Sequence, residues 1–202
     1  MDSVLESQHD TYFVQKVAVG SLAGVPRIDV MTQICQDKNV LHVGCVDFPI
    51  TDLNNNLHLQ LESVCQSLDG FDVNSDAFEQ LQPHVSGRLF DRWEDVSGQY
   101  DVVLVPEVME HVDNVADFLG KLSALDAKAY VITVPDAFQC FKQHFDYNAG
   151  SETFVEVVHP DHNCWYTPYT FQNTIKKYTD WNIQGIWFYN RISLLMIATR
   201  AA

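Results

Sequence analysis

Short runs of apolar and β-branched residues alternate along the chain with stretches whose apolar side chains recur every three or four positions. The short runs predict strands at residues 40–44, 69–73, 86–90, 101–105, 128–134, 182–188 and 192–199. The stretches between them predict helices at residues 57–67, 77–81, 114–125 and 168–178. Ser75 and Asp113 are expected to cap the second and third helices, and Pro168 suits the first turn of the fourth.

Strands separated by helices imply right-handed crossovers, which produce a mainly parallel sheet covered by helices on both faces. Only residues 189–191 separate the last two strands, a distance that permits a hairpin but not a helical crossover. We therefore expect a doubly wound α/β fold. Its seven-stranded sheet should be mainly parallel, with an antiparallel terminal strand at one edge.

The length of 202 residues suits one domain, spanning residues 1–202. Within it, residues 1–39 are expected to form an N-terminal extension of one or two helices, packed over the sheet or the ligand, and residues 40–199 the α/β core. The connection from Asp136 to Glu156 is longer than usual. Residues 136–166 are therefore expected to form a cap on the substrate side, where such insertions commonly determine substrate choice.

Acidic residues outnumber basic ones by 27 to 12, which gives a formal net charge of −15. A surface of this sign repels phosphate backbones, so no nucleic-acid partner is expected. The apolar stretch from Val17 to Val25 is too short to span a bilayer, and the five cysteines form no Cys-x-x-Cys pair. A cytoplasmic protein without a membrane partner or a structural disulfide is expected, and no pattern indicates an oligomeric state.

Small ligands of open α/β sheets bind at the carboxyl ends of the strands, where the strand order reverses. Carboxylates dominate the residues at that edge. Asp72 ends the second predicted strand, where an acid can accept hydrogen bonds from a ribose diol or simply cap the following turn. Residues that follow other strands include Gly44, Cys45, Trp93, Glu94, Asp95, Glu107, Glu110 and His111.

Four blocks, in this order, resemble the class I S-adenosylmethionine-dependent methyltransferases: VLHVGC, GFDVNSDAFEQL, YDVVLVPEVMEHV and HPDHNCWYTPYTF. The resemblance implies a Rossmann-like methyltransferase fold and S-adenosylmethionine as the cofactor. It also implies that Gly44 adjoins the methionine part of the cofactor and that Asp72 holds the ribose. Glu94 or Asp95 would meet the adenine amino group, Glu107 would lie beside the methyl donor, and Cys45 and Val73 would complete the cofactor site. A carboxylate-rich edge suits a cationic sulfonium better than a pyrophosphate.

The first block departs from the family pattern. His42 replaces the usual acid, and Val46 and Phe48 stand where small residues are common. Val46 is β-branched and is expected to keep an ordinary backbone conformation. These departures motivate an alternative, which is a catalytically degenerate module that keeps the fold and binds a cofactor or a partner without turnover.

His111 and His162 are the candidate general bases, because a protonated acceptor must lose a proton during methyl transfer. The alternative is that His111 only donates a hydrogen bond to a backbone carbonyl and that His162, like His159, is a surface loop residue. The spacing Glu107, Glu110, His111, with His162 as a distal ligand, also resembles the divalent-metal site of small-RNA terminal 2′-O-methyltransferases and ubiquinone-pathway O-methyltransferases. It implies a cation such as Mg²⁺, although metal-free relatives share the string. A zinc site at His159, His162 and Cys164 is a weaker alternative. The expected function is methyl transfer to a small-molecule acceptor, at a hydroxyl of, for example, a sugar or an isoprenoid precursor.

Overall fold

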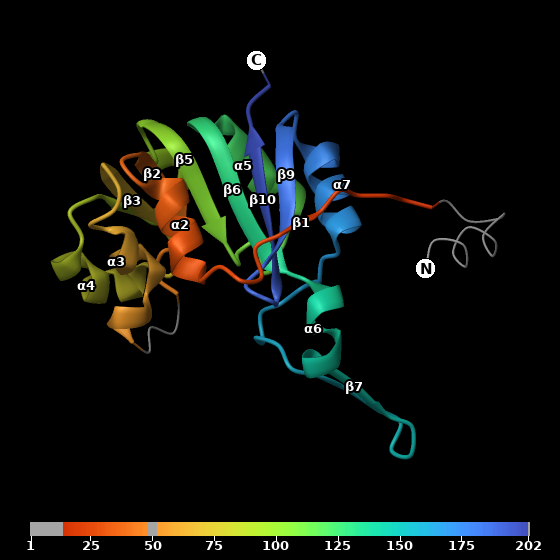
Figure 1. Ribbon diagram of the computed structural model, residues 1–202. Coiled ribbons are helices and arrows are strands. Elements are labelled where there is room, and N and C mark those ends of the chain that lie inside the picture. The colour runs from red at the N-terminus through yellow and green to blue at the C-terminus, as the bar shows by residue number, and fades with distance from the viewer. Residues whose placement is uncertain (1–13, 48–51, 202) are drawn as a thin grey trace.

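The computed structural model describes residues 14–47 and 52–201. Their main feature is one mixed sheet (Figure 1). Its strands are β1 (Gly20–Ser21), β2 (Asn39–Val43), β3 (Ser67–Phe71), β4 (Leu89–Phe90), β5 (Gln99–Pro106), β6 (Asp126–Pro135), β9 (Asn182–Tyr189) and β10 (Ser193–Thr199). They follow the order β1-β9-β10-β6-β5-β2-β3-β4, and the doubly wound, mainly parallel α/β fold is confirmed.

We expected the antiparallel strand to lie at an edge of the sheet, but it does not. β10 pairs antiparallel with both β6 and β9, so it is an interior strand. The edge is the two-residue β1, which pairs parallel with β9 and brings the described part of the sheet to eight strands rather than seven. The register pairs Leu194 with Val134 and Phe188, which buries the apolar strand β10 between two neighbours.

Six described helices accompany the sheet: α2 (Arg27–Cys35), α3 (Leu57–Leu61), α4 (Phe78–Leu81), α5 (Val115–Ala124), α6 (Ala137–His144) and α7 (Pro168–Tyr178). Short 3-10 turns lie at Leu53–Asn55, Ser75–Ala77, Gln82–His84 and Trp93–Asp95. The predicted helix at residues 168–178 is confirmed. It begins at Pro168 after Thr167, whose hydroxyl accepts a hydrogen bond from the Thr170 N–H.

Three local expectations were wrong. The cap of α5 is Asn114 and not Asp113, because the Asn114 side chain accepts from two N–H groups of the first turn. Ser75 lies within a 3-10 turn and caps nothing. Helix α3 ends at Leu61, well before residue 67, because the chain turns there and Ser67 already pairs with Asn39 of β2.

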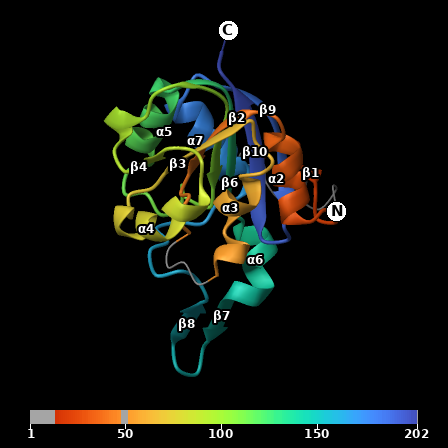
Figure 2. The ribbon, with the colours of Figure 1, turned by 90° about the vertical axis from the view of Figure 1, so that its left-hand side faces the viewer.

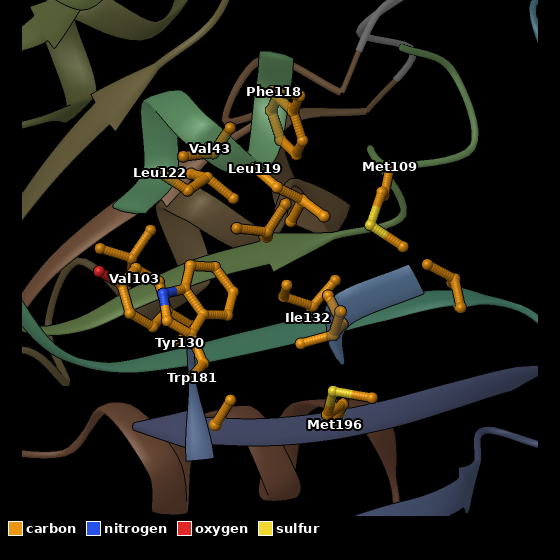
Figure 3. Packing of buried hydrophobic residues seen from close by; sticks show 14 of the residues in the cluster. Val43, Val103, Met109, Phe118, Leu119, Leu122, Tyr130, Ile132, Trp181 and Met196 are labelled. Atoms are coloured by element: carbon orange, nitrogen blue, oxygen red, sulfur yellow. The ribbon is translucent and has the colours of Figure 1, made fainter. Parts of the chain in front are cut away.

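Alternate residues along each strand point to opposite faces of the sheet, and each face carries an apolar layer. Val43, Val103 and Ile132 pack against α5 and α7. Figure 3 shows this layer, in which the rings of Tyr130 and Trp181 stack with their centroids 3.7 Å apart. The opposite face packs against α2 and α3, and Figure 2 shows α2 across the sheet from α5 and α7.

The N-terminal extension is only partly helical where the structure describes it. Residues 14–26 are non-helical and include β1, and α2 is the one described helix of residues 14–39. This helix packs on the sheet through Val30, Met31 and Cys35. Residues 1–13 lie outside the described part, as does Phe48.

Residues 136–166 contain α6 and a hairpin of β7 (Phe145–Asn148) and β8 (Thr153–Glu156). Neither the helix nor the hairpin was predicted. The hairpin projects from the body at the carboxyl end of β6 (Figures 1 and 2). Within the described residues, no helix is long and apolar enough to cross a membrane. All five cysteines are free, and three of them are buried.

Candidate functional site

A cleft of about 810 Å³ opens at the carboxyl ends of β2 and β5, where the connections diverge to opposite sides of the sheet. This volume lies within the usual range for small-molecule sites, roughly 300–1,000 Å³. A second hollow of about 400 Å³ shares part of its wall. The residues that line both are Gly44, Asp72, Val73, Val108, His111 and Asp113.

Gly44 provides the clearance between the end of β2 and the loop after β5. Its φ of +80° is one that L side chains rarely adopt, and an added Cβ would lie 2.5 Å from Cγ2 of Val108. The neighbouring Val46 is not among the residues with positive φ, in agreement with the sequence-based expectation. Val46 is fully buried and packs with Cys45 and Leu81. Its side chain therefore turns into the core and does not fill the cleft.

Asp72 both lines the cleft and organises its loops. One carboxylate oxygen accepts a hydrogen bond from the Val46 N–H at 3.0 Å, and the other accepts from the Asn74 N–H at 2.9 Å. The residue is 7% exposed, whereas the adjacent Val73 is 75% exposed. Asp72 thus joins the loops after β2 and β3, and its turn-capping role coexists with a place on the cleft wall.

A cationic corner occupies the part of the cleft near α2. Arg27, at the start of that helix, and His42, where the family has an acid, both line the cleft. His42 is 2% exposed, and its Nδ1 lies 3.3 Å from Nδ1 of the buried His58. Its Nε2 has no hydrogen-bond partner among the described residues. Burial, His58 and Arg27 hold the pKa of His42 well below its usual value.

Glu107 and Glu110, in the loop after β5, have buried carboxylate oxygens that lack a hydrogen-bond partner among the described residues. Glu107 lines it with a φ of 53°, a strained value for a residue with a side chain. Glu110 is fully buried, and neither of its carboxylate oxygens has a hydrogen-bond partner among the described residues. Burial raises the pKa of Glu107, and burial together with Glu107 raises the pKa of Glu110 to about 9. An unpartnered buried carboxyl is costly and commonly marks a functional site.

His111 and His162 lie together beside Glu110, whereas Glu107 does not belong to this group. Their ring centroids are 4.6 Å apart, and Nε2 of His111 lies 3.9 Å from Glu110. Ligand atoms of Glu110, His111 and His162 all lie within 4.8 Å of one another, a set that could hold a metal ion. Burial, with neighbouring histidines, lowers the pKa of both imidazoles, that of His162 to about 4. His111 ends a turn after β5, since its N–H donates a hydrogen bond to the Val108 carbonyl.

The remaining candidate residues are divided between the cleft and the exposed surface. Glu94 and Asp95 are exposed and line neither hollow, whereas Trp93 of the same turn lines the smaller one. Cys45 lines the larger cleft. His159 lines the cleft as well, while Cys164 is exposed and belongs to no described cluster of possible metal ligands.

Sequence reasoning missed Arg27. It is the only Lys or Arg between Lys16 and Lys38. Its isolation in an acidic chain was the signal in the sequence that could have marked it as a candidate site residue.

No family model and no curated protein matches the chain. Several solved structures match it. Magnesium protoporphyrin IX methyltransferase from Synechocystis PCC 6803 with bound SAH matches with a TM-score of 0.56 and 14% identity, over 86% of this chain and 82% of that one. The N-methyltransferase NodS from Bradyrhizobium japonicum WM9, with SAH, matches with a TM-score of 0.54 and 11% identity, over 87% and 85%.

A chain of the Pnkp1/Rnl/Hen1 RNA repair complex is also similar, with a TM-score of 0.55 and 15% identity. The match covers 89% of this chain and 42% of that one. These likenesses concern the arrangement of the backbone, which agrees with the strand order and the interior antiparallel β10 described above. The chain has the fold of the class I S-adenosylmethionine-dependent methyltransferases.

Proposed function

We propose that this protein is an S-adenosylmethionine-dependent methyltransferase that methylates a hydroxyl group of a small molecule. The observation that carries the proposal is the composition of one cleft. Gly44, Asp72, Glu107 and His111 come from loops after three different strands and line the same cavity at the position where this fold binds its ligands.

The residues present fit the cofactor. The clearance at Gly44 leaves room for its methionine part, and Asp72 remains on the wall for the ribose. Arg27 and His42 supply positive charge and an unpaired imidazole nitrogen for its carboxylate. For the adenine we propose the smaller hollow and Trp93, in place of Glu94 or Asp95. When bound, the cofactor supplies a methyl group activated by a sulfonium.

The chain's own task is to orient the acceptor and to receive its proton. His111 is the proposed base, because it lines the cleft and its lowered pKa keeps the imidazole neutral near pH 7. His162, 4.6 Å away between ring centroids, is the second candidate. Positioning typically contributes roughly 7–11 kcal/mol to such a reaction and a general base about 10²–10⁴-fold in rate.

A small-molecule acceptor is favoured by charge. The net charge of −15 opposes a polyanionic substrate, even though one structural neighbour belongs to an RNA repair complex. Binding of RNA would require a basic surface to neutralise phosphates.

A divalent cation such as Mg²⁺ is a further proposal for the same site, with Glu107, Glu110, His111 and His162 as ligands. It is supported by the two unpartnered oxygens of buried Glu110 and by the grouping of Glu110 with both histidines. A hard cation with oxygen and imidazole ligands would lower the pKa of an acceptor hydroxyl. Full binding and turnover in excess chelator would exclude this role.

The decisive experiment is calorimetry of the full chain with S-adenosylmethionine and S-adenosylhomocysteine. Micromolar binding of either supports the proposal, and no heat at millimolar ligand overturns it. Radiolabelled methyl transfer to a panel of small hydroxylated compounds then separates an enzyme from the alternative, a degenerate binding module. Binding of the cofactor without transfer to any acceptor would favour the module.

A further inference from the structure

The hairpin β7–β8 has one aromatic face and one mostly polar face. Its register pairs Phe145 with Glu156 and Tyr147 with Phe154. Residues paired across antiparallel strands share a face, and alternate residues along a strand point to opposite faces. Phe145, Tyr147 and Phe154 therefore lie on one face, which we call the aromatic face. The opposite face carries Asp146, Asn148, Thr153 and Val155.

The aromatic face continues to the candidate base through a row of rings. The His162 ring lies 4.6 Å from that of His111 and 5.9 Å from that of Trp165. Trp165 lies 4.9 Å from Phe145, which is 6.1 Å from Phe154. All these centroid distances fall within the range of contacting aromatic rings. The side chain of Trp165 also donates a hydrogen bond to Glu156 of the hairpin.

The outer part of this row is uncovered. Tyr147 is 61% exposed and Phe154 59% exposed, although both are large and face the same way. In the part of the chain that the structure describes, the hairpin pairs with no third strand. A hairpin without a packed face is only marginally stable in water. Exposed aromatic rings that adjoin a site commonly form part of a binding surface.

The charge and the aromatic rings of the hairpin indicate which kind of ligand the aromatic face would bind. Asp146, Glu152 and Glu156 make the hairpin acidic, which opposes a phosphorylated or otherwise anionic ligand. Flat aromatic rings stack on a flat aromatic ring over its whole area. A sugar can stack on such rings too, but its many hydroxyls would need hydrogen-bond partners, and the polar groups of this face are the Tyr147 hydroxyl and the Glu156 carboxylate. The row begins at His111 and His162, the proposed bases, beside which the proposed function places the acceptor hydroxyl.

We propose that the methyl acceptor is a neutral, planar aromatic compound with a hydroxyl group, bound against Trp165 and the aromatic face. This inference rests on the proposed function. The hydroxyl proton passes to the imidazole of His111 or His162 while the oxygen forms a bond to the methyl carbon. The sulfur–methyl bond breaks, and its electron pair remains on sulfur, which becomes a neutral thioether.

The test is calorimetry of the full chain saturated with S-adenosylhomocysteine, using 2-naphthol and geraniol as probes. Both are ten-carbon alcohols, but only 2-naphthol is planar and aromatic. We expect 2-naphthol to bind at least tenfold more tightly. Phe154→Ser should weaken its binding at least fivefold. Val155→Ser is the matched control, because Val155 is the next residue of the same strand, is 45% exposed and lies on the opposite face.

The outcomes are distinguishable. If S-adenosylhomocysteine itself does not bind, the proposed function fails. If it binds but 2-naphthol binds no better than geraniol, or Phe154→Ser has no effect, the aromatic acceptor is refuted while the proposed function stands. If Phe154→Ser instead converts a dimer to a monomer in sedimentation and leaves 2-naphthol binding unchanged, the face is an interface between copies. Equal melting temperatures of the two variants check that both fold.

Discussion

A Cβ atom added to Gly44 would lie 2.5 Å from Cγ2 of Val108. Gly44 follows β2 and Val108 follows β5, so the two residues lie on the loops after the two strands at whose ends the cleft opens. The absence of a side chain at residue 44 therefore sets the separation of the two loops that would hold the cofactor.

We expect Gly44→Ala to lower the free energy of unfolding by about 1–2 kcal/mol, because φ of +80° strains any L side chain, with a further loss from the clash. Affinity for S-adenosylhomocysteine should fall at least tenfold. Urea unfolding and calorimetry measure the two effects. Gly120→Ala is the control, since its Cβ would meet nothing within 4 Å in α5 and should stabilise the helix by about 0.5–1 kcal/mol.

Asp72→Ala should weaken the binding of S-adenosylhomocysteine at least tenfold in calorimetry, because it removes the ribose acceptor. It should also destabilise the fold by about 1–3 kcal/mol, since the Val46 and Asn74 N–H groups lose their acceptor. Asp76→Asn, at an exposed acid in the next turn, is the control. Unchanged affinity would show that the ribose lies elsewhere.

Arg27→Gln should reduce the affinity for S-adenosylhomocysteine about fivefold to tenfold, through loss of a charge-assisted contact to its carboxylate. Binding of 5′-methylthioadenosine, which lacks the amino-acid part, should not change. Arg200→Gln removes an equal charge from a residue bonded to the Ser123 carbonyl, at the opposite end of the strands, and should affect neither ligand. Equal losses for both ligands would contradict the assignment of the cationic corner.

The stability of the protein should fall in mild acid because His58 is buried. Burial lowers its pKa to about 4, whereas in the unfolded chain it is about 6.5. Between these values the unfolded chain binds a proton that the folded protein does not. The stabilisation is thus complete above pH 6.5 and decreases by up to about 1.4 kcal/mol per pH unit as the pH falls toward 4.

Urea unfolding at pH 7.5 and pH 5 should show a loss for the wild type that is about 1–2 kcal/mol larger than for His58→Gln, which keeps a polar partner for His42. His84→Gln, at an exposed histidine, should retain the wild-type loss. The same pH dependence in all three proteins would exclude His58 as its source.

The proposed cation site predicts that Mg²⁺ raises the melting temperature of the wild type. Glu110→Gln should abolish this rise, because an amide cannot lose a proton to become the carboxylate that would bind the cation, while binding of S-adenosylhomocysteine persists. Glu79→Gln, at an exposed helical acid, should respond to Mg²⁺ as the wild type does. A rise that survives in Glu110→Gln would remove Glu110 from the ligand set.

The sequence alone determined the features that depend on local preference. Apolar runs predicted the long strands, Pro168 marked the start of α7, and residues after the strands predicted the cleft. These succeed because strand burial and helix capping act on neighbouring residues, and because parallel strands end at one edge of the sheet. The roles of the candidate residues stay predictions.

Tertiary structure decided what depends on contacts between distant segments. It placed β10 inside the sheet, brought Arg27 to the cleft opposite Glu107, and seated His162 beside His111, 51 residues earlier in the chain. It also formed the hairpin whose aromatic face lies in the open. The alternation of Phe145 and Tyr147 with Asp146 and Asn148 was the available signal, but it spans only four residues and its side chains are mostly exposed, so it did not record a buried strand face.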